Sequence, residues 1–447
     1  MSALSPRQLH LNINALHSGF VPSAWRVADA DPRVFLDVNH YVRLAQIAER
    51  ACLDAIFLAD NAAISDQLDL RPITALEPTL LLTSVAAATT HLGLIATAST
   101  SYNEPYNIAR RFATLDLISN GRAGWNIVTT ADVASARNFG LDAVPDHAQR
   151  YARADEFATL VKTLWNSWDD DAFIADKASG RFVDLSKVHA AAHRGRFFGV
   201  QGALNLPRSA QGHPVLVQAG ASGDGRDLAA RHAEAVFSAS QSFDESRAYR
   251  DDLNARAARY GRGPNAVKVL AGLTTIIGST ESEARRRRDE LIDLIPERYS
   301  LNRLAGTLGI PADTLSFDQR LPDDLPLPNN GNGNHTFFNA TLALARKNGY
   351  TVRELVRELA GGGGHRVIVG TPEQIADDIT HWFENGAADG FNLMPDALPD
   401  GLEAFTEGVV PILQQRGIFR RAYEGKTLRS HLGLATPEAH RAAERAA

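Results

Sequence analysis

Cysteine is almost absent from this chain of 447 residues, which contains a single one, Cys52. One cysteine excludes an internal disulfide framework and any metal site built from several thiolates. Long apolar runs are also missing: no stretch approaches the roughly 18 residues that a membrane span requires. The N-terminus has no charged-then-apolar signal pattern either. We therefore expect a cytoplasmic protein with no membrane partner.

Charge of one sign is not concentrated anywhere in the chain. Acidic and basic residues are interspersed, and the formal net charge is -6. Because no basic face emerges, nucleic acid is not an expected partner. The composition, 44% hydrophobic and 22% charged, is that of a soluble enzyme. A chain of this length can bury one large core or two smaller ones, so length alone leaves the domain number open.

Short apolar runs alternate with helical periodicity through most of the sequence, which is typical of a repeated βα unit. Eight runs are predicted to be strands, at residues 9–14, 54–60, 91–97, 122–128, 213–220, 235–239, 267–277 and 390–394. Eight strands with intervening helices favour a closed (β/α)8 TIM barrel over a doubly wound open sheet. We expect one domain over residues 1–447, with long insertions at about 166–212, after strand 4, and about 296–366, between strands 7 and 8.

Polar side chains, nearly all of them neutral, lie at the ends of the predicted strands, where catalytic and binding groups gather in a parallel barrel. They include Asn12, Asn14, Asp60, Asn61, Thr97, Ser99, Thr100, Asn126, Thr129, Thr130, Gln218 and Ser222. This lining has few charges and suits an uncharged, hydrogen-bonding heterocycle such as an isoalloxazine better than a metal ion. The alternative is that these polar strand ends are simply solvated.

The segment AGASGDGRDLAARHA, residues 219–233, runs from a buried strand through three glycines into a helix. Backbone amides and the positive end of the helix dipole then point at one place, which is a geometry that binds phosphate. The glycine spacing only partly matches a dinucleotide motif, so a nicotinamide site is weakly indicated. A purely structural glycine turn is the alternative.

Two segments resemble a known family. The stretch STSYNEPYNIARR, residues 99–111, and above all GRAGWNIVTT, residues 121–130, resemble the flavin-dependent monooxygenases of the bacterial luciferase superfamily. The resemblance is to the branch that contains nitrilotriacetate monooxygenase and dibenzothiophene-sulfone monooxygenase. It extends from about residue 7 to LRSHLGL, residues 428–434. The fold of that superfamily is the (β/α)8 barrel, in agreement with the strand pattern.

The resemblance assigns cofactor-binding roles to five residues. FLAD matches the family's second strand and implies that Asp60 contacts FMN, and ATAST implies the same for Thr97. The run HAQRYARADEF carries the family's His and Tyr at His147 and Tyr151, and Ser222 matches the residue expected at the phosphate. A tyrosine hydroxyl, a serine hydroxyl and backbone amides are uncharged phosphate donors, and His147 adds a charge when protonated.

The resemblance also implies an activity and partners. It implies the oxygenase component of a two-component monooxygenase that uses FMNH2 from a separate NAD(P)H:flavin reductase, with O2 as cosubstrate. The expected assembly is a homodimer or homotetramer. Insertion of one oxygen into a small organic substrate, followed by C–N or C–S cleavage, is the expected reaction. An F420-dependent oxidoreductase of the same superfamily and a non-catalytic flavin-binding protein are the alternatives.

Two positions depart from relatives on loops that we expect to face the substrate. Val21 stands where many relatives have a His, with His17 four residues upstream, and Thr307 stands where the sulfone-oxidising branch has a His. The second insertion also contains the glycine-rich stretches 329–334 and 361–364 on either side of a helical piece, 336–359. We interpret this segment as a lid with two hinges, or alternatively as an oligomer-contact arm.

Overall fold

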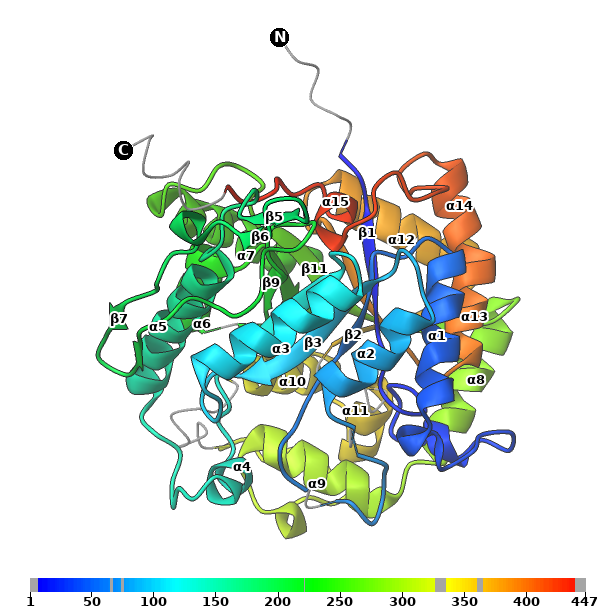
Figure 1. Cartoon of the computed structure of the whole chain (residues 1–447). Helices are drawn as coiled ribbons and strands as arrows, with labels where there is room; N and C mark the ends of the chain where they lie inside the picture. Colours follow the sequence, from blue (N-terminus) through cyan, green and yellow to red (C-terminus); the bar gives the residue numbers. More distant parts are fainter. Residues whose placement is uncertain are drawn as a thin grey trace.

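The computed structural model describes residues 7–64, 67–73, 76–220, 222–325, 335–359 and 365–438. Eight parallel strands form a closed ring in the order β10, β9, β4, β3, β2, β1, β13, β11, and the ring closes because β11 also pairs with β10. These strands are β1 (His10–Asn14), β2 (Ala55–Leu58), β3 (Gly93–Ser99), β4 (Ala123–Val128), β9 (Val215–Gln218), β10 (Ala235–Ser238), β11 (Lys268–Ile277) and β13 (Gly390–Pro395). The predicted (β/α)8 barrel is confirmed (Figure 1).

Helices connect the barrel strands and pack around them. They are α1 (Val38–Arg50), α2 (Pro78–Ala87), α3 (Pro105–Ile118), α4 (Val133–Asn138), α5 (His147–Trp165), α6 (Gly223–His232), α7 (Phe243–Arg259), α8 (Glu281–Asp293) and α12 (Pro372–Glu384). α5 begins where the Asp146 side chain accepts hydrogen bonds from the backbone amides of Ala148 and Gln149. Such a cap satisfies amides that have no partner within the helix. Among the described residues, no helix is both long and apolar enough to cross a membrane.

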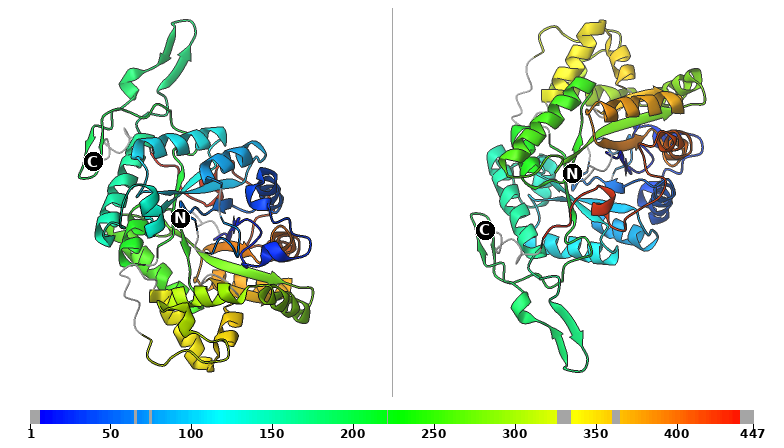
Figure 2. Two further views of the ribbon diagram at one scale, coloured as in Figure 1. Left: turned by 90° about the horizontal axis from the view of Figure 1, so that it is seen from below. Right: turned by 90° about the horizontal axis from the view of Figure 1, so that it is seen from above.

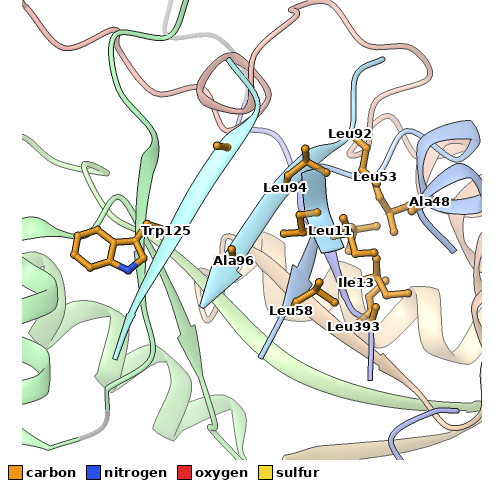
Figure 3. Close-up of a cluster of buried hydrophobic side chains, with 14 of the residues drawn as sticks. Leu11, Ile13, Ala48, Leu53, Leu58, Leu92, Leu94, Ala96, Trp125 and Leu393 are labelled. Atoms are coloured by element: carbon orange, nitrogen blue, oxygen red, sulfur yellow. The ribbon is translucent and has the colours of Figure 1, made fainter. Parts of the chain in front are cut away.

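Side chains alternate between the two faces of each strand, and the two sets make separate cores. Leu11 and Ile13 of β1 pack outward with Leu53 and Ala48 of the α1 segment (Figure 3). Asn12 and Asn14, the residues of β1 with the opposite parity, therefore face the inside of the barrel. The inner cluster comprises Ala55, Phe57, Ile95, Val215, Val217, Ala235, Phe237, Leu270, Leu428 and Leu432.

The barrel is closed at the amino ends of its strands and open at their carboxyl ends. Leu428 and Leu432 belong to the segment of α15 (Leu428–His431), which lies near the amino ends of the strands (Figure 1). The C-terminal α13 (Asp400–Ala404), the π-helix η5 (Phe405–Val409) and α14 (Val410–Gln415) pack on the outside. The carboxyl ends of the strands, at the opposite end from α15, are left for ligands.

The polar sequence of the first insertion favours irregular structure, but the insertion is partly regular. It forms two antiparallel pairs: β5 (Phe173–Asp176) with β6 (Arg181–Val183), and β7 (His193–Arg194) with β8 (Gly199–Val200). Figure 2 shows the first hairpin projecting away from the body of the barrel. Its strands are short and mostly exposed, so they carry no apolar pattern from which a strand could be predicted.

The second insertion contains α9 (Glu297–Leu308), α10 (His335–Asn348) and α11 (Val352–Glu358), which lie at the carboxyl end of the barrel (Figure 1). The expected helical piece, 336–359, is thus two helices, separated at Gly349, whose φ is 66°. An unpredicted ninth strand, β12 (Arg366–Gly370), follows and pairs with the second half of β11. The predicted hinges at 329–334 and 361–364 lie outside the described residues.

Candidate active site

A cavity of about 330 Å³ lies at the carboxyl end of the barrel and reaches from its interior to the first turn of α6. Strand residues form its inner part, and the loop after β9 with Arg226 of α6 forms its outer part. The lining residues include Asn14, Phe57, Ala219, Gly220, Arg226, Phe237, Ser238, Tyr249, His365, Asn392 and Met394. One continuous space therefore joins a half-apolar interior to a helix N-terminus.

The barrel interior holds amide oxygens that have no hydrogen-bond partner among the described residues. Asn12, Asn126 and Asn392 are each at most 3% exposed, and the side-chain oxygen of each accepts no hydrogen bond from the described residues. Thr97, predicted to contact the cofactor, is 3% exposed, and its hydroxyl accepts a hydrogen bond of 2.9 Å from the Asn126 amide nitrogen. A buried polar group without a partner costs about 1–3 kcal/mol. These groups therefore fit a ligand that offers several hydrogen-bonding atoms.

The imidazoles near this opening are uncharged at neutral pH. Burial, with a contribution from the nearby Arg303, lowers the pKa of His365 to about 4. Burial and the charge of Arg71 lower the pKa of His17, three residues beyond β1, to about 3. Each ring keeps one nitrogen, Nδ1 of His365 and Nε2 of His17, without a partner among the described residues. Both are neutral hydrogen-bonding groups available to a ligand.

Three of the predicted site residues meet at the N-terminus of α6. Ser222 caps the helix, and its hydroxyl accepts a hydrogen bond of 3.1 Å from the Gly225 amide. The Tyr151 hydroxyl lies 3.4 Å from the Ser222 hydroxyl, and the His147 ring packs on the Tyr151 ring with centroids 4.7 Å apart. His147 Nδ1 is 3.0 Å from the Asp224 carboxylate. When this imidazole is protonated, its Nε2–H remains for an anion.

Gly225 leaves room for two hydroxyl groups at this turn. A Cβ at this position would lie 3.1 Å from the Ser222 hydroxyl and 3.2 Å from the Tyr151 hydroxyl. The loop before it is held by Tyr249, whose hydroxyl donates a hydrogen bond of 2.7 Å to the Gly220 carbonyl. Backbone amides, two hydroxyls and the positive end of the α6 dipole thus converge on a small volume. This arrangement fits a single phosphate group.

Asp60 is not brought into contact with the other four residues. Its side chain is exposed after β2, and among the described residues no hydrogen bond joins it to Thr97, Tyr151 or Ser222. Desolvation, with Glu77 nearby, raises the pKa of Asp60. It therefore lies at the rim of the opening, and its assignment to the cofactor stays a prediction.

Several lining residues were not singled out from the sequence. Asn392 and Met394 are on β13, the last strand of the barrel along the chain, which closes the same ring of strand ends. His365 precedes β12, which was not predicted, and its ring reaches toward Gly272 of β11. Tyr249 lies in the middle of α7, where no sequence pattern separates it from an ordinary buried aromatic residue.

The two departures from relatives fall near one another in the second insertion and the loop after β1. Val21 is buried in a small apolar cluster with Leu291, Ile295 and Tyr299. Thr307 is on α9, and its hydroxyl donates a hydrogen bond of 3.1 Å to the Arg303 carbonyl. Val21 thus packs with Tyr299 in the first turn of α9, and Thr307 lies in its last turn. Within the described part of the chain, no group of three or more metal-ligating side chains is present.

Comparison with known proteins gives matches over nearly the whole chain. The family model of luciferase-like monooxygenases matches residues 19–389. Nitrilotriacetate monooxygenase component A of Aminobacter aminovorans is 44% identical over 97% of this chain and 98% of its own. Dibenzothiophene-sulfone monooxygenase of Rhodococcus erythropolis (strain XP) is 40% identical over 97% of this chain and 98% of its own.

A solved structure agrees with the sequence matches. That of a riboflavin lyase with modified FMN and riboflavin superposes with a TM-score of 0.82 at 32% identity, covering 96% of this chain and 97% of that one. The resemblance predicted from GRAGWNIVTT is therefore confirmed. With a barrel of the same fold and homologous sequence along its length, the protein belongs to the luciferase-like monooxygenase family.

Proposed function

We propose that the protein is the oxygenase component of a two-component, FMNH2-dependent monooxygenase. The observation that carries this proposal is the cavity that extends from the unpartnered side-chain oxygens of Asn14 and Asn392 inside the barrel to Gly220 and Arg226, beside the N-terminal turn of α6. FMN has one hydrogen-bonding ring and one terminal phosphate, which is the combination that this cavity fits. The dinucleotide FAD would need a further groove for its adenylate.

The residues of this chain have three tasks in such a reaction. Asn12, Thr97, Asn126 and Asn392 hold and orient the ring, and Tyr151, Ser222 and His147 hold the phosphate. Phe57 and Phe237, whose rings are 4.6 Å apart, form an apolar wall that excludes water from the reacting region. When bound, reduced flavin supplies the two electrons with which O2 is activated, so that one oxygen atom enters the substrate and the other leaves as water.

A separate NAD(P)H:flavin reductase is the proposed source of reduced FMN. The turn before α6 offers room for one phosphate and has only part of a dinucleotide pattern. The relative from Aminobacter aminovorans is itself named a component, which agrees with this division of labour. We further propose a cytoplasmic homodimer or homotetramer.

The proposed reaction is insertion of oxygen beside nitrogen or sulfur, with C–N or C–S cleavage following. An F420-dependent oxidoreductase is the alternative, because it would use the same barrel and the same anion-binding turn for hydride transfer without O2. The two differ in a simple measurement. The oxygenase binds FMN and consumes O2 with substrate, whereas the alternative binds the deazaflavin and reacts equally well without O2.

Anaerobic titration with reduced FMN and reduced FAD tests the cofactor assignment. We expect tighter binding of FMN; tighter binding of FAD contradicts the proposal. The partner is tested with NADH, FMN and a candidate substrate, where the purified protein alone is expected to be inactive until a flavin reductase is added. Rapid NADH oxidation by the protein alone would contradict the two-component assignment.

A further inference from the structure

Two guanidinium groups meet at one phenol oxygen beside the opening of the barrel. Arg71 Nη1 donates a hydrogen bond of 3.1 Å to the Tyr299 hydroxyl oxygen, and Arg303 Nη1 donates one of 2.9 Å to the same atom. Arg71 follows the loop after β2, and Tyr299 and Arg303 lie one turn apart on α9. Two cations are thus held within hydrogen-bonding distance of a single neutral oxygen.

In the described part of the chain, neither cation has a carboxylate partner. Arg298, on the same helix as Arg303, is by contrast paired with Asp69. The Tyr299 pKa is lowered: burial opposes the change, but the adjacent Arg303 and Arg71 outweigh it. Two adjacent guanidinium groups repel each other, and an anion placed between them removes that repulsion.

The position of this pair relates it to the candidate active site. Arg71 is close enough to His17, and Arg303 to His365, for their charges to act on those imidazoles. His365 lines the cavity of the barrel opening. Tyr299 is 3% exposed and packs with Val21, whereas both arginines are half-buried and reachable from solvent. The pair therefore lies on the side of the opening away from the phosphate turn of α6.

Three donors are available to a ligand there. The Tyr299 oxygen accepts from both arginines, so its own O–H has no acceptor among the described residues. The remaining N–H groups of two guanidinium forks lie on either side of it. Planar forks of this kind match a carboxylate in two-bond geometry. Of the two positions where the chain departs from its relatives, Val21 packs in the cluster of Tyr299, and Thr307 is hydrogen-bonded to the Arg303 carbonyl.

We propose that Arg71, Arg303 and Tyr299 bind a carboxylate of the substrate, so that the enzyme acts on an amine or thioether that carries carboxylate groups. This inference rests on the proposed function, because it names the substrate class of that oxygenase. An apolar sulfone or alkane would leave both cations unneutralised when bound. A carboxylated substrate is instead anchored at one end while the rest of it extends toward His365 and the barrel interior.

The chain offers a matched control for the test. Arg298 is on the same helix and pairs with Asp69 of the same loop, but both side chains are about 60% exposed. The variants Arg71→Gln, Arg303→Gln and Tyr299→Phe are compared with Arg298→Gln, which breaks another tie between the same two segments. Nitrilotriacetate and its uncharged trimethyl ester are the probes, with binding measured by calorimetry. FMN and riboflavin binding to each variant is measured separately by flavin fluorescence.

We expect Arg71→Gln and Arg303→Gln each to weaken nitrilotriacetate binding by about tenfold or more, the scale of a hydrogen bond to a charged group. Tyr299→Phe is expected to weaken nitrilotriacetate binding less, and Arg298→Gln to leave it unchanged. Binding of the trimethyl ester should not differ between the original protein and the Gln variants. Arg303→Lys, which keeps the charge, should recover part of the affinity. FMN affinity should be unchanged in all variants.

Several results would overturn the inference. One is equal nitrilotriacetate binding by the original protein, both Gln variants and Arg298→Gln, which would make the pair a structural tie. Another is no carboxylate binding at all. A third is loss of FMN but not riboflavin affinity in the Gln variants, which would make the pair the phosphate site. Arginine-dependent carboxylate binding by a protein that binds no FMN would refute the proposed function and leave the carboxylate site standing.

Discussion

The hydroxyl groups of Tyr151 and Ser222 lie 3.4 Å apart at the first turn of α6 and have different local duties. Ser222 also caps the helix, whereas Tyr151 packs against His147 without a capping role. We expect Tyr151→Phe and Ser222→Ala each to weaken FMN binding by about 1–3 kcal/mol, because each removes a hydrogen bond to a charged phosphate. Fluorescence titration measures this. Riboflavin, which has no phosphate, is the control ligand, and its affinity should be unchanged.

Equal FMN affinity in both variants and the original protein would mean that the turn is purely structural. Ser222→Ala should also destabilise the protein by roughly 1 kcal/mol through loss of the cap, whereas Tyr151→Phe should not. Thermal unfolding without flavin therefore separates the two duties.

Asn392 places a buried amide inside the barrel. It is 1% exposed, and its side-chain oxygen has no partner among the described residues. Replacing it with Leu, which has a similar shape, removes an uncompensated buried amide. We expect unfolding of the flavin-free protein to need equal or higher temperature, while riboflavin binds about tenfold or more weakly. A less stable flavin-free protein with unchanged riboflavin affinity would contradict this assignment.

Residues of the candidate site differ in how far the sequence reveals them. Asn12 and Asn126 could be identified because they lie on strands that are predicted from their own apolar runs. His365 and Tyr249 could not, because one is brought to the opening by a strand pairing and the other by the packing of α7. Local pattern identifies residues whose place depends on their own element. It does not identify residues whose place depends on contacts distant in sequence.

Strands and helices of the barrel follow the same distinction. The barrel strands are buried on both faces, so they appear as continuous apolar runs. β12 was missed because its residues are mostly half-buried and it pairs with only one neighbour, β11. The exposed hairpins of the first insertion were missed because their pairing is not driven by an apolar face.

The helices of the second insertion form a small body of their own. α9, α10 and α11 share an apolar cluster of their own, which includes Leu304, Leu308, Phe338 and Leu355 and is separate from the main core. α11 is joined to the segment after α9, where the Val352 amide donates a hydrogen bond of 2.8 Å to the Gln319 carbonyl. A body with its own small core can open without unfolding the barrel.

If this body is a lid, substrate and flavin together should slow amide hydrogen exchange across residues 297–359 as one unit. Exchange in the β5–β6 hairpin, which is distant from the opening, is the internal control. An oligomer-contact arm would instead show exchange that is insensitive to ligand and slows as protein concentration rises.

At the scale of the whole molecule, the barrel is held at its filled end by buried histidines. Burial lowers the pKa of His213 and of His431 to about 4 in each case. Since an unfolded histidine has a pKa of about 6.5, the unfolded chain binds more protons between pH 6.5 and 4. The contribution of these two histidines to the free energy of unfolding is therefore fully present above pH 6.5 and is lost as the pH falls to about 4. Each histidine contributes at most roughly 3 kcal/mol.

Thermal unfolding measured from pH 4.5 to 7.5 checks this dependence. His431→Gln, which keeps a donor for the His91 carbonyl, should flatten the slope, whereas the exposed His381→Gln should not. A slope equal in His431→Gln and the original protein would show that other groups control acid unfolding.

The proposed monooxygenase function requires oxygen transfer with reduced FMN. The most direct measurement mixes the purified protein with photochemically reduced FMN, labelled O2 and a panel comprising nitrilotriacetate, other aminocarboxylates and dibenzothiophene sulfone, with no reductase or NADH present. We expect one labelled oxygen atom in the product of a carboxylated substrate, and none when protein or reduced FMN is omitted. Absence of label from every product, together with substrate reduction or oxidation by reduced or oxidised F420 without O2, would contradict it.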